Sequence, residues 1–126
     1  MTKNSKKFVA LDIETTDLDP AIGKVIEIGM AKYAKGEKTG EWKSFINPGE
    51  KIPPLIQSIT GIKDKDVDSA PAFGEVKKEV KKFVGDYPIV GHNVQFDLNF
   101  LAAKGLTLDN AVFDTWKLAT IILPGL

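Results

Sequence analysis

Cysteine is absent from the 126-residue chain. Disulfide bonds and metal sites built from thiolates are therefore excluded. A chain without disulfides suits the reducing cytoplasm, so we expect a cytoplasmic protein.

Excess charge of either sign and long apolar runs are absent as well. The chain has 17 Lys and Arg residues and 17 Asp and Glu residues. This balance disfavours tight, non-specific binding of duplex nucleic acid, but it allows a small site that grips one strand end. No apolar stretch approaches the roughly 20 residues that span a bilayer, and residues 1–7 are polar and basic, unlike a signal peptide. We therefore expect no membrane partner.

The composition is that of one ordinary globular domain, with 43% hydrophobic and 27% charged residues. Apolar residues predict strands at residues 8–13, 24–34 and 41–46. A polar turn is predicted at 35–40, and Asn47-Pro48-Gly49 ends the third strand. Three successive strands joined by turns indicate an antiparallel meander.

Helices and short strands alternate in the rest of the chain. The predicted helices cover residues 55–59, 63–67, 70–84, 93–104 and 115–123, and the predicted strands cover 88–91 and 111–113. The helix at 70–84 has the clearest apolar face, with Ser69 as a candidate N-cap and Pro71 in its first turn. Gly105 would end the helix at 93–104. A meander followed by alternating helices and strands predicts an α/β domain with a mixed sheet.

Two acidic residues, Asp12 and Glu14, stand two positions apart on the first predicted strand. Because side chains alternate along a strand, both face the same side, with Cα atoms about 7 Å apart. At that distance they repel by about 2 kcal/mol at an effective dielectric constant of about 20. A divalent cation would offset this cost, and oxygen ligands favour Mg²⁺ or Mn²⁺ over zinc. The alternative is that both acids are solvated at a strand end, the commoner case for an isolated Asp-x-Glu.

A third acid, Asp97, lies in the first turn of the helix predicted at 93–104. There it would stabilise the helix dipole, and it could also reach the neighbouring strand and join the other two acids. The apolar residues around it recur at helical spacing, so we interpret them as core rather than as substrate contacts. They are Phe96, Leu98, Phe100, Leu101 and Ala103.

Short motifs occur in a fixed order along the chain. They read DIETT from Asp12, NPG from Asn47, IP from Ile52, ITGI from Ile59, GHNVQFDLNFL from Gly91 and DTWKLA from Asp114. This set resembles the DEDD-type, or DnaQ-like, 3′→5′ exonucleases. Within that superfamily it is similar to the proofreading epsilon subunit of bacterial DNA polymerase III and to related exonuclease domains of bacterial polymerases and helicases. The resemblance implies a ribonuclease H-like α/β fold, in which a mixed sheet of three antiparallel strands and then parallel strands is flanked by helices.

By this resemblance, the domain hydrolyses the terminal phosphodiester bond at 3′ ends of single-stranded DNA, in proofreading or repair. Asp12, Glu14 and Asp97 would be the catalytic residues and would bind two Mg²⁺ or Mn²⁺ ions, which suit phosphodiester hydrolysis. The implied partners are a single-stranded 3′ end, with DNA favoured over RNA, and a DNA polymerase or helicase. Three alternatives stay open: an RNA-trimming exonuclease, a non-catalytic module that binds nucleic acid or a polymerase, and an α/β domain whose acids are merely solvated.

The resemblance also implies five residues that bind the terminal nucleotide. Thr15 and Thr16 would line its pocket through backbone N–H groups and a hydroxyl, Thr60 and Gly61 would approach the sugar or base, and Asn93 would contact the substrate backbone. Four of them have a structural alternative: a strand-end turn for the two adjacent threonines, a helix stop for Gly61, and an N-cap for Asn93.

Two other polar residues of these motifs are left outside the catalytic set. His92 is the only histidine, but the resemblance implies a structural or minor role for it rather than that of general base. Asp114 precedes the helix predicted at 115–123, where N-capping explains it.

The superfamily's third motif pairs a histidine base with an aspartate five residues later, and residues 1–126 do not contain it. We therefore expect residues 1–126 to form an incomplete exonuclease domain, truncated at its C-terminus and missing the last helices. Because loss of a general base costs about 10²–10⁴-fold, this chain alone should be weakly active or inactive. The missing helices would leave an apolar patch uncovered, which favours self-association.

Overall fold

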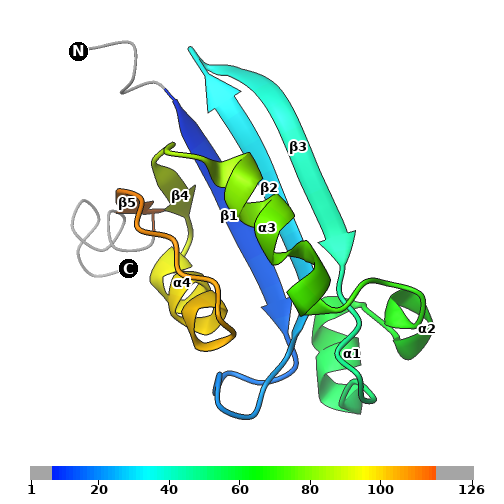
Figure 1. Ribbon diagram of the computed structural model, residues 1–126. Coiled ribbons are helices and arrows are strands. Elements are labelled where there is room, and N and C mark those ends of the chain that lie inside the picture. Colours follow the sequence, from blue (N-terminus) through cyan, green and yellow to red (C-terminus); the bar gives the residue numbers. More distant parts are fainter. Residues whose placement is uncertain (1–6, 116–126) are drawn as a thin grey trace.

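The computed structural model describes residues 7–115. Its centre is a five-stranded sheet in the order β3-β2-β1-β4-β5 (Figure 1). The first three strands, β1 (Phe8–Thr15), β2 (Val25–Ala34) and β3 (Glu37–Phe45), are antiparallel. The two short strands β4 (Ile89–Gly91) and β5 (Val112–Asp114) continue the sheet in parallel with β1. The predicted mixed α/β sheet is thus confirmed.

Four helices accompany the sheet in the described part of the chain. The longer two, α3 (Phe73–Val84) and α4 (Val94–Ala103), lie on one face of it, and α1 (Pro54–Thr60) and α2 (Asp64–Val67) lie at the end where β1 finishes (Figure 1). None of the helices described here is long and apolar enough to cross a membrane.

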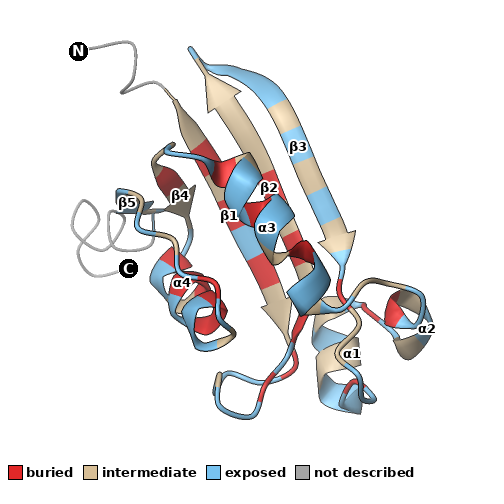
Figure 2. Cartoon of the chain, in the orientation of Figure 1, coloured by how far each residue is buried: buried red, intermediate tan, exposed pale blue. Residues whose placement is uncertain are grey.

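The main core lies between the sheet and the two longer helices (Figure 2). Along β1 the odd-numbered residues Val9, Leu11 and Ile13 are buried, whereas Asp12 between them is exposed. The helices contribute a buried face each, made of Val76, Val80 and Val84 in α3 and Leu98, Phe100 and Leu101 in α4. Each such side chain contributes about 1.5–3 kcal/mol on burial. This packing directs the even-numbered side chains of β1 to the opposite face of the sheet.

A second, smaller core fixes α1 and α2 against the end of the sheet. It consists of Ile26, Ile52, Ile62 and Val67, all nearly inaccessible to solvent. The Asp64 carboxylate in α2 accepts a hydrogen bond of 2.8 Å from the Ile52 backbone N–H. Ile52 and Ile62 flank α1 in the chain and Ile56 of α1 packs against the same cluster, so this small core sets the position of α1, which matters for the site described below.

Some predicted boundaries are wrong, and the pairing of strands and extended segments explains the errors. The third strand begins at Glu37 rather than at residue 41, because pairing with β2 extends it through the residues assigned to a turn. The turn is only Lys35-Gly36, with φ of 55° and 79°, values that fit a two-residue hairpin turn. Part of the helix predicted at 115–123 lies outside the described residues.

The third helix begins at Phe73, three residues later than predicted, and Ala72 rather than Ser69 is its N-cap. Residues before it run beside the segment after β3, where the Asn47 N–H donates to the Pro71 carbonyl at 2.8 Å and Asn47 pairs with Ala72. Pro71 therefore belongs to an extended segment and not to the first turn of α3.

Candidate active site

Asp12 and Glu14 project from β1 on the face opposite the core. Glu14 pairs across the sheet with Glu27 of β2, and Asp12 pairs with Gly29. Partial burial raises the pKa of Glu14 above its ordinary value, and the charges of Asp12 and Glu27 raise it further. The strand therefore concentrates negative charge at this point, as its alternation of side chains predicts.

Asp97 meets β1 between these two acids. Along the same edge of β1, the Val9 N–H donates to the Pro88 carbonyl at 2.8 Å. Further along, β4 ends at Gly91, and the Asp97 Oδ2 atom accepts the Ile13 N–H at 3.1 Å. The Asp97 side chain is only 6% exposed. Its carboxylate therefore substitutes for a strand carbonyl at the residue that separates Asp12 from Glu14.

The electrostatic environment of Asp97 is unfavourable to its charge. Burial raises the pKa of Asp97 to about 7, and the hydrogen bond from Ile13 acts in the opposite direction. The negative charges of Asp12, Glu14 and Asp114 also raise it. The three predicted carboxylates thus interact electrostatically in one region, and a bound cation would relieve the cost of charging Asp97.

Close packing of the turn between β4 and α4 permits this approach. A Cβ on Gly91 would lie 2.8 Å from the Leu11 carbonyl oxygen and 2.8 Å from the Val94 Cβ. Those distances are well inside van der Waals contact, so only glycine fits here without a shift of the backbone. Gly91 therefore allows α4, and with it Asp97, to lie against β1.

Asn93 is the N-cap residue of α4, as predicted, but its side chain does not cap the helix. Asn93 adopts a left-handed conformation with φ of 54°, and its side chain makes no capping hydrogen bond to α4. Instead, the Asp114 carboxylate accepts the N–H of Asn93 at 2.8 Å and that of Gln95 at 3.5 Å. The reason is the sheet register, which pairs Asp114 with Gly91 across parallel strands. Asp114 therefore accepts backbone N–H groups at the start of α4, which precedes it in the chain, whereas its predicted capping of the helix at 115–123 involves residues outside the described part of the chain.

A cavity of about 580 Å³ opens beside Glu14. It is enclosed by the end of β1, the loop that follows, and α1; its lining residues are Ile13, Glu14, Thr15, Thr16, Asp17, Leu18, Pro53, Leu55, Ile56, Ile59, Thr60 and Phe96. Leu18, Leu55 and Ile59 are 80%, 69% and 70% exposed. The cavity therefore combines an acidic edge with an exposed apolar rim, which is suited to a ligand with a charged end and a flat apolar part.

The predicted nucleotide-binding residues divide into two groups. Thr15, Thr16 and Thr60 line the cavity, whereas Gly61 and Asn93 are not among the residues that enclose it. Gly61, with φ of 78°, ends α1, so it has the role of a helix stop that was its predicted alternative to nucleotide binding.

The threonine hydroxyls are also engaged within the protein. Thr15 Oγ1 donates to the Asp17 carbonyl at 2.9 Å, and Thr16 Oγ1 accepts the Lys24 N–H at 2.8 Å. The Thr16 N–H donates to the Lys24 carbonyl at 2.8 Å. Thr60 Oγ1 donates to the Ile56 carbonyl at 2.8 Å and accepts the Ile62 N–H at 3.1 Å. These bonds fix the cavity wall, and Thr16 retains its own hydroxyl hydrogen for donation.

The apolar part of the cavity was not anticipated. Phe96 packs against the core, as expected, but it also lines the cavity. Leu55 and Ile59 stand four apart on α1, and that spacing is the one signal in the sequence that points to a shared face. Ala103, assigned to the core, is exposed.

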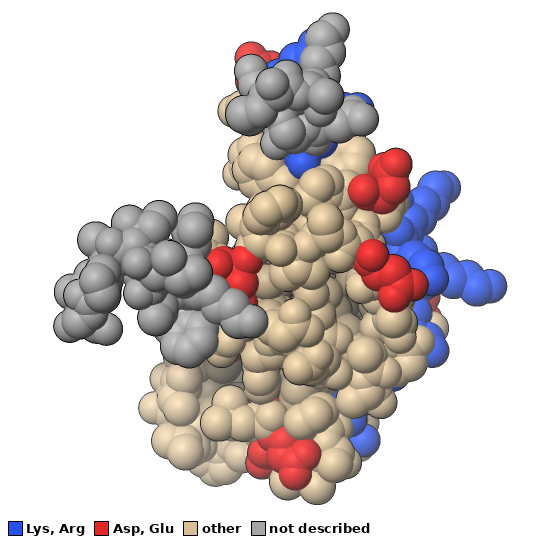
Figure 3. Space-filling view, turned by 90° about the vertical axis from the view of Figure 1, so that its left-hand side faces the viewer, with Lys and Arg blue, Asp and Glu red and all other residues tan. Residues whose placement is uncertain are grey.

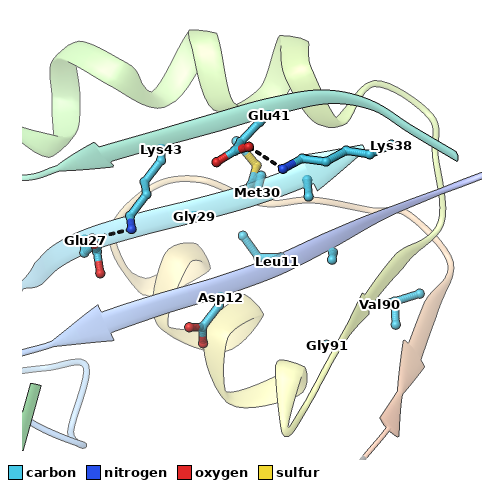
Figure 4. Close-up of a pocket in the computed structure, with 12 residues that line it drawn as sticks. Leu11, Asp12, Glu27, Gly29, Met30, Lys38, Glu41, Lys43, Val90 and Gly91 are labelled. Atoms are coloured by element: carbon cyan, nitrogen blue, oxygen red, sulfur yellow. Dashed lines mark hydrogen bonds and ion pairs between the residues drawn. The ribbon is translucent and has the colours of Figure 1, made fainter. Parts of the chain in front are cut away.

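A second hollow of about 370 Å³ lies over the sheet face that carries Asp12 (Figure 4). Its floor includes the small residues Ala10, Gly29 and Ala31. Two ion pairs border it, Lys38 with Glu41 and Lys43 with Glu27, the latter at 3.7 Å. On the side of the molecule shown in Figure 3, acidic side chains form separate small groups and lysines gather along one border, with no broad basic surface between them.

The three acids are chemically suited to bind a divalent cation, although their carboxylates do not surround a single point. Within residues 7–115, no group of three acidic or histidine side chains is placed so that it could hold one metal ion. The donor set nevertheless offers only carboxylate oxygens, which hard cations prefer, and burial, together with the neighbouring negative charges, raises the pKa values of Glu14 and Asp97, a cost that a cation would offset. His92 is exposed and lies 3.4 Å from Thr115 Oγ1, in the turn before α4.

Comparisons with known proteins agree with this architecture. Residues 9–126 match the protein family described as Exonuclease. The chain is 36% identical over 128 residues to the 3′-5′ exonuclease DinG of Bacillus subtilis (strain 168), which covers 97% of this chain and 14% of that protein. It is 36% identical over 124 residues to the PolC-type DNA polymerase III of Clostridium perfringens (strain 13 / Type A), which covers 95% of this chain and 9% of that protein.

A solved structure of exonuclease X in complex with 5′-overhanging duplex DNA superposes with a TM-score of 0.77 at 24% identity. The superposition covers 94% of this chain and 66% of that one, and it shows that the fold is shared. The chain thus spans only a small part of the length of the DinG and PolC-type relatives. Because the family match extends over nearly every residue, this chain belongs to the exonuclease family.

Proposed function

We propose that this chain hydrolyses the terminal phosphodiester bond at the 3′ end of single-stranded DNA, as part of proofreading or repair. One observation carries the proposal: the Asp97 carboxylate accepts the Ile13 N–H between Asp12 and Glu14, beside a cavity of about 580 Å³. The relatives named DinG and PolC-type DNA polymerase III support the reaction class and the cellular context. Within that context, a polymerase or helicase is the proposed partner and the cytoplasm the proposed compartment.

In this mechanism Asp12, Glu14 and Asp97 would hold Mg²⁺ or Mn²⁺, with two ions in the complete site. Such ions activate a water molecule and stabilise the charge that gathers on the phosphate. The protein's own part is to bind and orient the terminal nucleotide. The base would lie among the apolar side chains of the cavity rim, which exclude water, and the sugar-phosphate would point toward Glu14.

Domain extent and assembly belong to the same proposal. We assign residues 1–126 to an exonuclease domain that lacks the third motif, which accounts for the weak activity expected of the chain. Phe113 on β5 is 61% exposed, and we propose that this apolar side chain takes part in self-association.

A single-turnover assay tests the reaction. The substrate is a single-stranded DNA oligonucleotide labelled near its 5′ end, incubated with excess protein and Mn²⁺. We expect slow, stepwise shortening from the 3′ end, abolished by Asp12→Asn and unaffected by Asp109→Asn, which alters an exposed acid before β5. Internal cleavage, or shortening that survives Asp12→Asn, would contradict the proposal. An RNA strand of equal sequence tests the RNA-trimming alternative, which predicts faster cleavage of RNA.

A non-catalytic binding module is the second candidate, favoured by the open arrangement of the acids in residues 7–115. It predicts binding of the oligonucleotide without any dependence on metal. Calorimetric titration with Mn²⁺ separates the two functions. Heat of binding that disappears in Asp12→Asn supports the exonuclease, and its absence in the wild-type protein supports the binding module.

A further inference from the structure

The end of β5 is hydrogen-bonded to the turn that leads into α4. Besides the two bonds to the Asp114 carboxylate, from Asn93 at 2.8 Å and Gln95 at 3.5 Å, the neighbouring Thr115 hydroxyl donates to the Gly91 carbonyl at 3.3 Å. No other side-chain hydrogen bond to a backbone N–H of residues 91–95 is found in the described part of the chain. The first N–H groups of a helix need partners from outside it, and the Asp114 carboxylate at the end of β5 accepts one of them, that of Gln95.

The turn held by these hydrogen bonds has an unusual backbone conformation. Asn93 has φ of 54°, a region that residues other than glycine seldom adopt. The close contacts around Gly91 leave the turn little room to move toward β1. The Asp114 carboxylate therefore selects one geometry of the turn by accepting the N–H that the left-handed Asn93 presents.

The geometry of the turn decides where Asp97 lies. Asp97 stands in the first turn of α4, two residues beyond the Gln95 N–H that Asp114 accepts. Its carboxylate accepts the Ile13 N–H at 3.1 Å, and this hydrogen bond places the Asp97 side chain between Asp12 and Glu14. A small rotation of the start of α4 would draw the Asp97 carboxylate away from β1.

We propose that Asp114 is a positioning residue of the candidate active site. Its carboxylate orients the start of α4 and thereby holds the Asp97 carboxylate against the Ile13 N–H. The expected effect of Asp114 on metal binding rests on the proposed function. The positioning of Asp97 by Asp114 does not rest on it, because the hydrogen bonds from the N–H groups of Asn93, Gln95 and Ile13 exist whatever the site binds.

Amide hydrogen exchange and Mn²⁺ titration together test the proposal. Asp114→Ala removes both acceptors, Asp114→Asn keeps one oxygen for the Asn93 N–H, and Asp109→Ala is the control for loss of an exposed acid. In Asp114→Ala we expect the Ile13 amide to exchange about 10-fold faster or more, while the Val80 amide in α3 keeps its wild-type protection. Loss of a supporting partner typically costs 10–100-fold in metal affinity, so Mn²⁺ affinity should fall by at least about 10-fold. Asp114→Asn should retain most of the wild-type protection of the Ile13 amide and most of the wild-type Mn²⁺ affinity.

The outcomes separate positioning from plain structural support. Faster exchange at Ile13 and Val80 alike would mean that Asp114 only stabilises the fold, and unchanged exchange at Ile13 would also overturn the proposal. If Asp114→Ala does not fold, Asp114→Asn decides, because it must keep Ile13 protection within about threefold of wild type. If the wild-type protein binds no Mn²⁺, the proposed function fails, whereas the exchange measurements still decide the role of Asp114.

Discussion

The buried Asp97 carboxylate should make the free energy of unfolding depend on pH. Its pKa is raised from the ordinary 3.8 to about 7. Between these values the folded protein keeps a proton that the unfolded chain has released, so the unfolding free energy falls as the pH rises. At about 1.4 kcal/mol per pH unit the full shift would correspond to about 4 kcal/mol. Screening by solvent at the mouth of the site reduces our expectation to about 2 kcal/mol.

Asp97→Asn isolates this effect. The amide oxygen can still accept the Ile13 N–H, which now bonds to Asp97 Oδ2 at 3.1 Å, but the side chain no longer titrates. Urea unfolding in EDTA at several pH values between 4 and 8 gives the unfolding free energy of each protein. We expect the variant to gain about 2 kcal/mol relative to wild type between pH 4 and 7, and nothing more above pH 7. Acids that do not interact with Asp97 titrate alike in both proteins and cancel in the difference, so the difference reports Asp97 together with the three acids coupled to it, Asp12, Glu14 and Asp114.

Parallel pH profiles, agreeing within about 0.5 kcal/mol, would refute the reasoning, because they would show that Asp97 is charged in the folded protein at an ordinary pKa. The control Asp109→Asn alters an exposed acid and should give such a parallel profile. Repeating the series with Mn²⁺ tests the proposed ligand role. At 100 times its dissociation constant, Mn²⁺ should stabilise wild type by about 2.7 kcal/mol and Asp97→Asn much less.

Three further changes test other parts of the structure. Gly91→Ala places a Cβ 2.8 Å from the Leu11 carbonyl oxygen, so it should destabilise by about 1–3 kcal/mol in urea unfolding, and a neutral result would show that the turn has room to move. Ile59→Ser, at a side chain 70% exposed on the cavity rim, should change stability by less than about 0.5 kcal/mol while weakening binding of a 3′-fluorescent oligonucleotide; unchanged affinity would exclude the rim from the site. Phe113→Ser, at a residue 61% exposed, should reduce self-association in light scattering, and equal association of both proteins would place the contact elsewhere.

The parts of the fold that follow from local pattern were predictable from the sequence. Alternation along β1 separates buried Val9, Leu11 and Ile13 from Asp12, and the apolar spacing of α3 defines its buried face. These features depend on residues close together in the chain. The start of α3 was misplaced because it depends on Asn47, 25 positions before the Ala72 with which it pairs.

The acids of the candidate site, and the three threonines that line its cavity, were named from the sequence, but its apolar rim and the contacts of Asp114 were not. A two-residue spacing on a strand brings Asp12 and Glu14 together, and resemblance to known motifs adds Asp97. The role of Asp114 could not be inferred from its neighbours, because an aspartate before a helix is normally that helix's own cap. It depends instead on the parallel pairing of Gly91 with Asp114, which no local pattern records. The apolar cavity rim likewise arises from the packing of α1 against the end of the sheet.

The two explanations for Asp97, a backbone acceptor and a metal ligand, are compatible. A carboxylate has two oxygens and about four acceptor positions, and the contact to Ile13 uses Oδ2 alone. A backbone acceptor needs no negative charge, since a strand carbonyl or an amide side chain would serve equally well. Burying a carboxylate at this point, where desolvation and then the charges of Asp12 and Glu14 raise its pKa, instead costs stability. The presence of a carboxylate here is therefore better explained by the proposed cation than by the hydrogen bond that it accepts.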